Sequence, residues 1–187
     1  MPLARFFDRL LVHRLPYTGQ TRKGEVSMTH WQVNIAPAGP EDLPEILALQ
    51  KLAFQSEAER YDDYTLPPLT QTLEEMQADF EKMIFLKASV DGRIVGSVRA
   101  YAKEGTCFIS RLVVHPDFQH RGIGTQLMKA IEAHFRGIRR FELFTGHASV
   151  PALNLYRKLG YTEFRRKEMS THILVFLGKD VLSDAAL

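Results

Sequence analysis

The sequence is poor in the residues that build covalently or metal-stabilised folds. Its 187 residues include one cysteine, Cys107, which excludes an internal disulfide and any zinc site that needs several cysteines. No apolar run approaches the roughly 20 residues of a membrane-spanning helix. Hydrophobic residues make up 45% of the chain and charged residues 25%, which is typical of a globular protein. We therefore expect one soluble domain with an ordinary hydrophobic core.

Excess charge is small and lies at the N-terminal end. Residues 1–27 contain five basic and two acidic residues, whereas the remaining chain contains 19 basic and 20 acidic ones. A body without excess positive charge lacks the electrostatic basis for nucleic-acid binding. We expect residues 1–27 to be a flexible extension, or to precede a true start at Met28, although their basic amphipathic pattern also fits an organelle transit peptide. They lack a secretory signal, so we expect a cytoplasmic protein without nucleic-acid or membrane partners.

Hydrophobic periodicity predicts alternating strands and helices after Met28. Strands are expected around Trp31–Ile35 and over residues 84–90, 93–101, 107–114, 141–145, 161–166 and 171–177. Helices are expected over residues 41–54, 73–80, 122–135 and 151–159. Residues 55–70 are predicted to form a loop.

Two local signals support these boundaries. Thr72 and Glu75 have the spacing of a capping box at a helix start, and Asp91-Gly92 is a two-residue turn of the kind that hairpins prefer. The order of the elements predicts an α/β domain over residues 28–180, with a short tail over 181–187. Its mixed sheet would combine an antiparallel meander with a following β-α-β unit.

The segment FISRLVVHPDFQHRGIGTQLM gives the strongest indication of chemistry. Here Gln119-x-x-Gly122-x-Gly124 follows an apolar strand and opens a helix. Glycines allow close approach of the backbone, and the N–H groups of a helix's first turn favour anions, so this loop suits a pyrophosphate. An ordinary glycine-containing helix start is the alternative. Arg121 would add a cation beside the phosphates, or be a solvated turn residue.

A second motif follows about thirty residues later. It reads Ala152-x-x-Leu155-Tyr156-x-x-x-Gly160-Tyr161. Together, the two motifs resemble those of the GNAT acetyltransferase superfamily, in their order and in their structural setting. The resemblance extends from about Val33 to Leu177. It implies a fold in which the two central strands splay apart between flanking helices.

The resemblance implies acetyl-coenzyme A (acetyl-CoA) as the donor and an amine as the acceptor, and the residue pattern itself predicts no metal site. The strand backbone at Leu112, Val113 and Val114 would pair with the pantetheine arm. One of its N–H groups would stabilise the oxyanion. The remaining donor-binding residues implied by position are Gln119, His120, Arg121, Gly122, Ile123, Gly124, Thr125 and Ser149. Ser149 replaces the asparagine that is common at its position, and its hydroxyl still offers hydrogen bonds. Tyr156 would be the general acid that protonates the departing thiolate; a packing tyrosine is the alternative.

The general base is less directly indicated. Arg111 stands where many members of the family place an acid, and an arginine cannot take up a proton. We consider Glu142, on the strand beside the expected splay, as a catalytic residue. A second group of acids precedes residue 64 and would attract a cationic amine: Glu57, Glu59, Asp62 and Asp63. A water chain, or an amine that arrives neutral, would make a protein base unnecessary.

We therefore expect an N-acetyltransferase that acts directly on a small-molecule or peptide amine, with Glu57 and Glu59 on the acceptor side. Its histidines lack the paired spacing of helix metal ligands, and Cys107 is expected in the core. A homodimer is plausible for this family. The alternative function is a non-catalytic coenzyme A-binding sensor or interaction module. A protein that docks on nucleic acid or membrane would depend on residues 1–27 alone.

Overall fold

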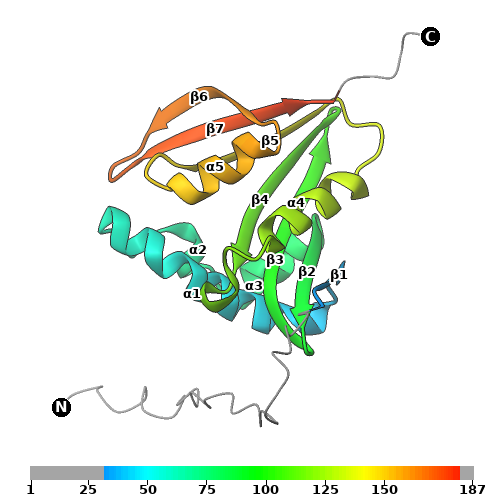
Figure 1. Cartoon of the computed structure of the whole chain (residues 1–187). Coiled ribbons are helices and arrows are strands. Elements are labelled where there is room, and N and C mark those ends of the chain that lie inside the picture. Colours follow the sequence, from blue (N-terminus) through cyan, green and yellow to red (C-terminus); the bar gives the residue numbers. More distant parts are fainter. Residues whose placement is uncertain (1–31, 182–187) are drawn as a thin grey trace, which may run out of the picture. The chain divides into compact units, whose positions relative to one another are not determined.

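The computed structural model describes residues 32–181 (Figure 1). The expected N-terminal extension, Trp31 and all of the expected tail except Val181 lie outside the described residues. The predicted domain boundaries therefore stay predictions.

Seven strands form one mixed sheet in the order β1-β2-β3-β4-β5-β7-β6. Strands β1 to β4 form an antiparallel meander, β4 and β5 are parallel, and β7 is antiparallel to both β5 and β6. This arrangement confirms the predicted mixed sheet. The strands are β1 (Asn34–Pro37), β2 (Ile84–Val90), β3 (Arg93–Lys103), β4 (Thr106–Val114), β5 (Arg140–Gly146), β6 (Thr162–Glu168) and β7 (Ile173–Asp180).

Five α-helices and two short 3₁₀ helices accompany the described sheet. They are η1 (Pro40–Asp42), α1 (Leu43–Tyr61), α2 (Pro67–Thr70), α3 (Leu73–Phe80), η2 (Pro116–Phe118), α4 (Ile123–His134) and α5 (Val150–Lys158). The predicted capping box at the start of α3 is confirmed. Thr72 Oγ1 accepts a hydrogen bond from the Glu75 N–H (3.1 Å), and Glu75 Oε2 accepts one from the Thr72 N–H (2.9 Å).

The predicted loop over residues 55–70 is wrong. α1 continues to Tyr61, and Pro67–Thr70 forms α2. The segment QSEAERY is polar but consists largely of good helix formers, and it contains no glycine or proline to end the helix. α1 ends only at Asp62, whose backbone is left-handed (φ 50°). As a result, side chains expected on a loop project from a rigid helix.

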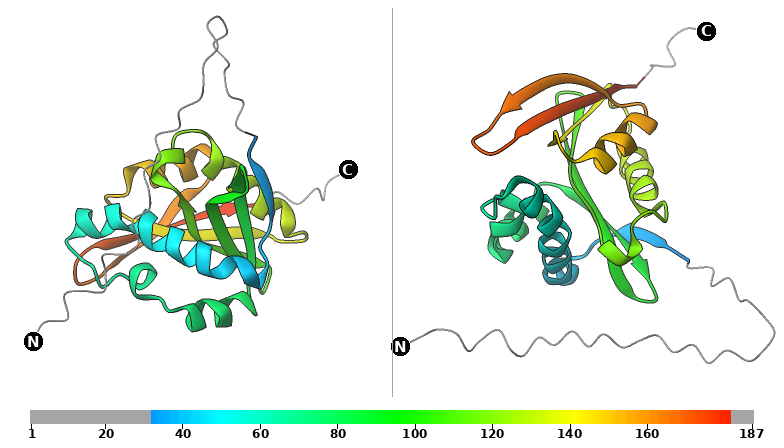
Figure 2. Two further views of the ribbon diagram at one scale, coloured as in Figure 1. Left: turned by 90° about the horizontal axis from the view of Figure 1, so that it is seen from below. Right: turned by 60° about the vertical axis from the view of Figure 1, so that its left-hand side comes forward.

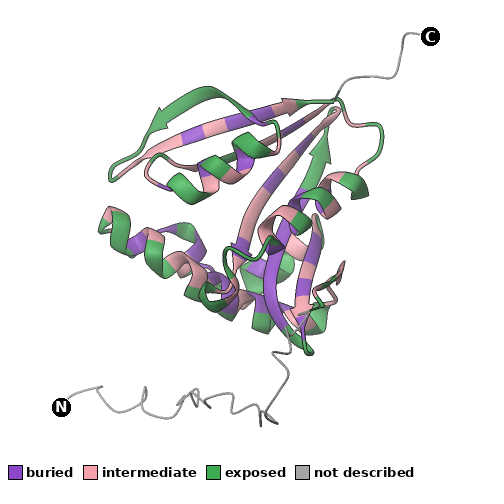
Figure 3. Ribbon diagram, viewed as in Figure 1, coloured by how far each residue is buried: buried purple, intermediate pink, exposed green. Residues whose placement is uncertain are grey.

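Helices cover both faces of the meander (Figure 2). α4 packs on one face through Leu127, Met128 and Ile131, which are fully buried. α1 and α3 pack on the other face, where residues such as Leu43 and Met76 form a second cluster. β3 lies between these layers and is buried over most of its length (Figure 3). β4, the last strand of the meander, is therefore supported by a buried neighbouring strand.

β4 and β5 separate after a short paired stretch. Their pairing runs only from Thr106 opposite Arg140 to Phe108 opposite Glu142, and in Figure 1 the two strands diverge from there. A bulge in β4 follows at Arg111, whose φ is 51°. The splayed strands that the resemblance implied are thus present. They leave the last residues of β4 paired with β3 on one side and open on the other.

Candidate active site

A cleft of about 980 Å³ fills the space where β4 and β5 separate. Its walls come from the end of β4, the first turn of α4, the end of β5, α5 and the C-terminal half of α1. Sequence segments about 100 residues apart therefore meet in one cavity. The cleft has room for an extended ligand as well as a second small molecule.

The loop before α4 forms one end of the cleft. Gly122, the N-cap of α4, has a φ of 79°, a left-handed conformation that glycine adopts readily. The first intrahelical bond runs from the Gln126 N–H to the Gly122 carbonyl (3.0 Å). The N–H groups of Ile123, Gly124 and Thr125 consequently have no acceptor inside the helix. Together with the helix dipole, they suit a phosphate group.

The predicted donor-binding residues differ in whether they line the cleft and in whether their side chains are exposed to it. Nearly all of them line the cleft; the exception is Arg121, which is exposed and lies over the Phe118 ring, 5.4 Å from its centroid. The Gln119 amide donates to the Val114 carbonyl (3.2 Å) and ties the loop to β4. The side chains of Val113 and Ile123 are buried in the core, so these two residues can offer a ligand mainly their backbone.

Tyr156 lies on α5 and lines the cleft. Only 7% of this residue is exposed. Burial raises the pKa of its phenol, and the nearby Glu57 carboxylate raises it further. The hydroxyl therefore keeps its proton at neutral pH and is available as a hydrogen-bond donor or an acid.

Glu57 faces Tyr156 from α1. Its Oε1 accepts a hydrogen bond from the Ser149 hydroxyl (2.9 Å) and forms an ion pair with Arg60. Its side chain is 20% exposed. Among the described residues that line the cleft, Glu57 is the one carboxylate. It is therefore the acid best placed to meet a cationic amine there.

Two other predicted acids lie elsewhere. Glu142 does not line the cleft; it pairs with Arg140 (2.7 Å), which also binds Asp180. Glu59 projects from α1 into solvent, outside the cleft lining. It is two residues from Glu57, and on a helix that spacing points the two side chains in different directions. The structure therefore does not bring Glu142 or Glu59 to Tyr156.

Tyr61 was missed by the sequence reasoning because it lies in the supposed loop. Its hydroxyl accepts a hydrogen bond from the Ala148 N–H (2.9 Å). Burial raises the pKa of Tyr61. A Cβ at Gly146 would stand 2.2 Å from this hydroxyl, so a glycine is needed there. Tyr61 thus fixes the end of α1 against the β5–α5 loop and forms part of the cleft wall.

The profile of the acetyltransferase (GNAT) family matches residues 43–161. This chain belongs to that family. The match covers both motifs and most of the cleft lining.

Two relatives illustrate the similarity, and one of them is named as an acetyltransferase. An acetyltransferase of Pectobacterium atrosepticum is 31% identical over 114 residues, which are 59% of this chain and 74% of that protein. The protein YqkA of Bacillus subtilis is 31% identical over 117 residues, or 63% of this chain. The chain spans about a third of the length of YqkA (34%).

Solved structures share the fold. The ribosomal-protein-S18-alanine N-acetyltransferase of Escherichia coli has a TM-score of 0.68 at 15% identity, covering 83% of this chain and 99% of that one. The PaiA N-acetyltransferase of Thermoplasma acidophilum, solved in complex with coenzyme A, has a TM-score of 0.60 at 17% identity, covering 80% and 99%. At these identities the similarity establishes the fold.

Two further observations concern residues 32–181. No helix among them is long and apolar enough to cross a bilayer. They also contain no group of three or more His, Cys, Asp or Glu side chains that could hold a metal ion.

Proposed function

We propose that this chain transfers an acetyl group from acetyl-CoA to a primary amine. The observation that carries the proposal is the position of Tyr156, a buried phenol in a cleft that also contains a helix N-terminus suited to phosphate. Family membership and the coenzyme A complex of a protein with the same fold support acetyl-CoA as the donor. Its pyrophosphate would lie at the first turn of α4.

The open side of β4 would hold the rest of the donor. Val113 and Val114 pair with β3, and past Phe108 no residue of β5 pairs with β4. The peptide-like pantetheine arm can therefore add to this edge as a short strand. A β4 N–H would then stabilise the negative charge that develops on the thioester oxygen.

Proton transfers would accompany the exchange of bonds. Glu57 would take a proton from the ammonium group, which leaves the nitrogen lone pair free to attack the thioester carbonyl carbon. The new C–N bond forms as the C–S bond breaks. Tyr156 would donate its proton to the sulfur as the C–S bond breaks, because its phenol stays protonated at neutral pH. The nitrogen would then lose its second proton, while Tyr156 would regain a proton and Glu57 would release its own through solvent. The products are an N-acetylated amine, coenzyme A and one proton.

A thiol-release assay tests the proposal. Acetyl-CoA would be incubated with separate pools of amino acids, polyamines, short peptides and simple amines, with donor binding measured in parallel by calorimetry. We expect coenzyme A release with at least one pool. Donor binding without release in any pool would instead favour a non-catalytic coenzyme A-binding module. Absence of donor binding would contradict the assignment of the α4 N-terminus.

A further inference from the structure

Two arginines lie beside each other near Asp79 of α3, on β3 and β4. Arg99 on β3 pairs with Ser110, which immediately precedes Arg111 at the β4 bulge. Arg99 is 4% exposed, whereas Arg111 lines the cleft. Nε of Arg111 is buried and has no hydrogen-bond partner among the described residues. The bulge therefore places Arg111 in the cleft wall without supplying its Nε with an acceptor.

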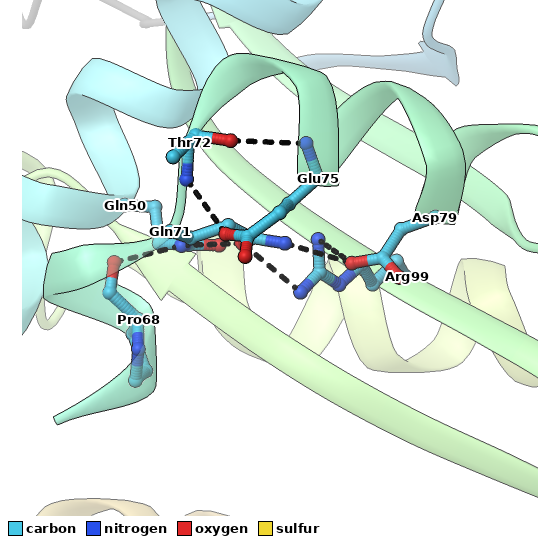
Figure 4. A network of polar contacts seen from close by, with 7 residues as sticks. All are labelled: Gln50, Pro68, Gln71, Thr72, Glu75, Asp79 and Arg99. Carbon is cyan, nitrogen blue, oxygen red and sulfur yellow. Dashed lines mark hydrogen bonds and ion pairs between the residues drawn. The ribbon is translucent and has the colours of Figure 1, made fainter.

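Arg99 has protein partners, which Figure 4 shows, although its own Nε and Nη1 form no hydrogen bond within the described residues. Its Nη1 lies 3.3 Å from Asp79 Oδ2, and its Nη2 donates to Gln71 Oε1 (3.3 Å). The same Asp79 oxygen accepts a bond from the Gln71 amide (2.8 Å). Gln50 in turn donates to Gln71 Oε1 (3.0 Å). The network thus holds Arg99 in place and engages the Asp79 carboxylate.

The charges in this cluster do not balance. Asp79 carries one negative charge against two guanidinium groups, and its ion pair within the described chain is with Arg99. Burial and the charge of Arg111 together lower the pKa of Arg99 to about 10, and the charge of Asp79 acts in the opposite direction. Burial of a cation without a full set of partners is costly, since water is lost and not replaced. A ligand with one negative charge would therefore neutralise the one excess positive charge at the cleft wall.

The donor's phosphates have a different place in the proposed complex, at the first turn of α4. The anion at Arg111 would accordingly belong to the acceptor. A carboxylate fits better than a phosphate, because it carries one charge and matches the planar guanidinium through two parallel hydrogen bonds. Glu57, which also pairs with Arg60, provides a carboxylate in the same cleft. A cleft that offers a guanidinium and an acid is complementary to a zwitterion.

We propose that the acceptor is a free amino acid, or a closely related amino-carboxylate, whose carboxylate binds Arg111. Arg99 supports this site as a second cation behind it. The proposal rests on the acetyl transfer proposed above and specifies its acceptor. Glu57 would meet the amine and Arg111 the carboxylate, so that the acceptor is held at both ends while its nitrogen approaches the thioester.

The test compares each amino acid with its carboxamide, which keeps the amine and the side chain but loses the negative charge. For the wild-type protein we expect kcat/KM to be about 10- to 100-fold higher for the acid. The variant Arg111→Gln should abolish this preference and leave the dissociation constant of acetyl-CoA unchanged. Arg111→Lys should restore part of it. Arg136→Gln, which removes a cation from an exposed loop, is the matched control.

Calorimetry with coenzyme A present gives a readout that does not depend on turnover. The wild-type protein should bind the amino acid more tightly than its carboxamide, and Arg111→Gln should bind both alike. Equal affinity of the wild-type protein for acid and amide overturns the proposal even if Arg111→Gln does not fold. Dipeptides provide a further arm: preference for them over free amino acids would contradict the free amino acid as acceptor. Transfer only to amines that lack a carboxylate would refute the carboxylate site but leave the proposed acetyl transfer standing. Absence of transfer to every pool would count against the proposed acetyl transfer itself.

Discussion

The Ser149 hydroxyl donates a hydrogen bond of 2.9 Å to Oε1 of Glu57. Ser149 is the N-cap of α5 and Glu57 lies on α1, so this bond joins two helices across the cleft. It occupies one carboxylate oxygen and holds the group near Tyr156, the proposed acid. The serine that departs from the family's usual asparagine thereby positions the proposed base.

Replacing Glu57 with glutamine removes the proposed base while keeping its size. We expect kcat to fall by about 100-fold near neutral pH, where the amine arrives protonated. The loss should shrink as the pH approaches the pKa of the amine, because a neutral amine needs no base. Steady-state rates across the pH range measure this. As a control, Glu59→Gln removes the same charge from the exposed side of α1. An equal fall of kcat in that variant would mean that Glu57 acts through long-range electrostatics and not as a base.

Tyr156→Phe should lower kcat by about 100-fold with little change in the affinity for acetyl-CoA, because the phenol acts as the thiolate leaves. Burial, together with Glu57, raises the pKa of Tyr156. In the wild-type protein, kcat should therefore show no decline from phenol ionisation up to about pH 10, the ordinary value for tyrosine. Full activity of Tyr156→Phe at every pH would exclude this role. A melting curve checks that the buried ring still packs.

Gly122→Ala tests the phosphate loop. The φ of Gly122 is 79°, and alanine at that angle costs about 1 kcal/mol. The backbone would shift and misalign the N–H groups of the first α4 turn, so we expect acetyl-CoA to bind roughly tenfold more weakly. Gly137→Ala is a matched control, since Gly137 has a φ of 70°, equally open surroundings and a position away from the cleft. Similar binding losses in both variants would mean that general destabilisation is the cause.

Cys107 should not react with thiol reagents in the folded protein. It is fully buried, and burial together with the charge of Glu132 raises its pKa to about 12. A thiolate is therefore almost absent near neutral pH. Labelling with a chromogenic disulfide should proceed only as fast as the chain unfolds, and should reach one thiol per chain in denaturant. Fast labelling without denaturant would contradict the buried position. Slow labelling would also mean that Cys107 contributes no background signal to the thiol-release assay.

Much of the fold could be predicted because its signals are local. Thr72 and Glu75 mark a helix start within four residues, and the Asp91-Gly92 turn alone pairs β2 with β3. Both residues of that turn have a positive φ (50° and 79°), as this type of turn requires. Such signals depend on neighbouring residues and not on the tertiary fold.

The site depended on contacts that no local pattern contains. Glu57 and Glu59 are equivalent in the sequence, and only the extension of α1 to Tyr61 decides that Glu57 faces the cleft. Glu142 was correctly expected at the splay, but its pairing with Arg140 could not be read from the sequence. In the sequence, Arg111 was noted only because it stands where many members of the family have an acid. Its relation to Arg99 depends on strand register and on the β4 bulge.

The contact between Asp42 and Lys87 should make stability depend on pH. Lys87 Nζ lies 2.7 and 2.6 Å from the two oxygens of Asp42, and the Gly39 N–H donates to Oδ2 (2.7 Å). Burial raises the pKa of Asp42, but these bonds outweigh it and leave the pKa below the ordinary 3.8. A carboxyl with a lowered folded-state pKa stabilises the protein above that ordinary value, and the gain disappears as the pH falls through the folded-state pKa.

Asp42→Asn should therefore lower the free energy of unfolding by about 1 kcal/mol near neutral pH, a modest value because the pair is partly exposed. The difference from the wild-type protein should narrow once the pH drops below 3.8. Urea unfolding over this range measures it, with Glu81→Gln, an exposed helix-end substitution, as the control. The difference in the free energy of unfolding could instead stay constant down to the lowest pH at which both proteins fold. In that case the charge of Asp42 contributes nothing, and the substitution acts only through the hydrogen bond from the Gly39 N–H.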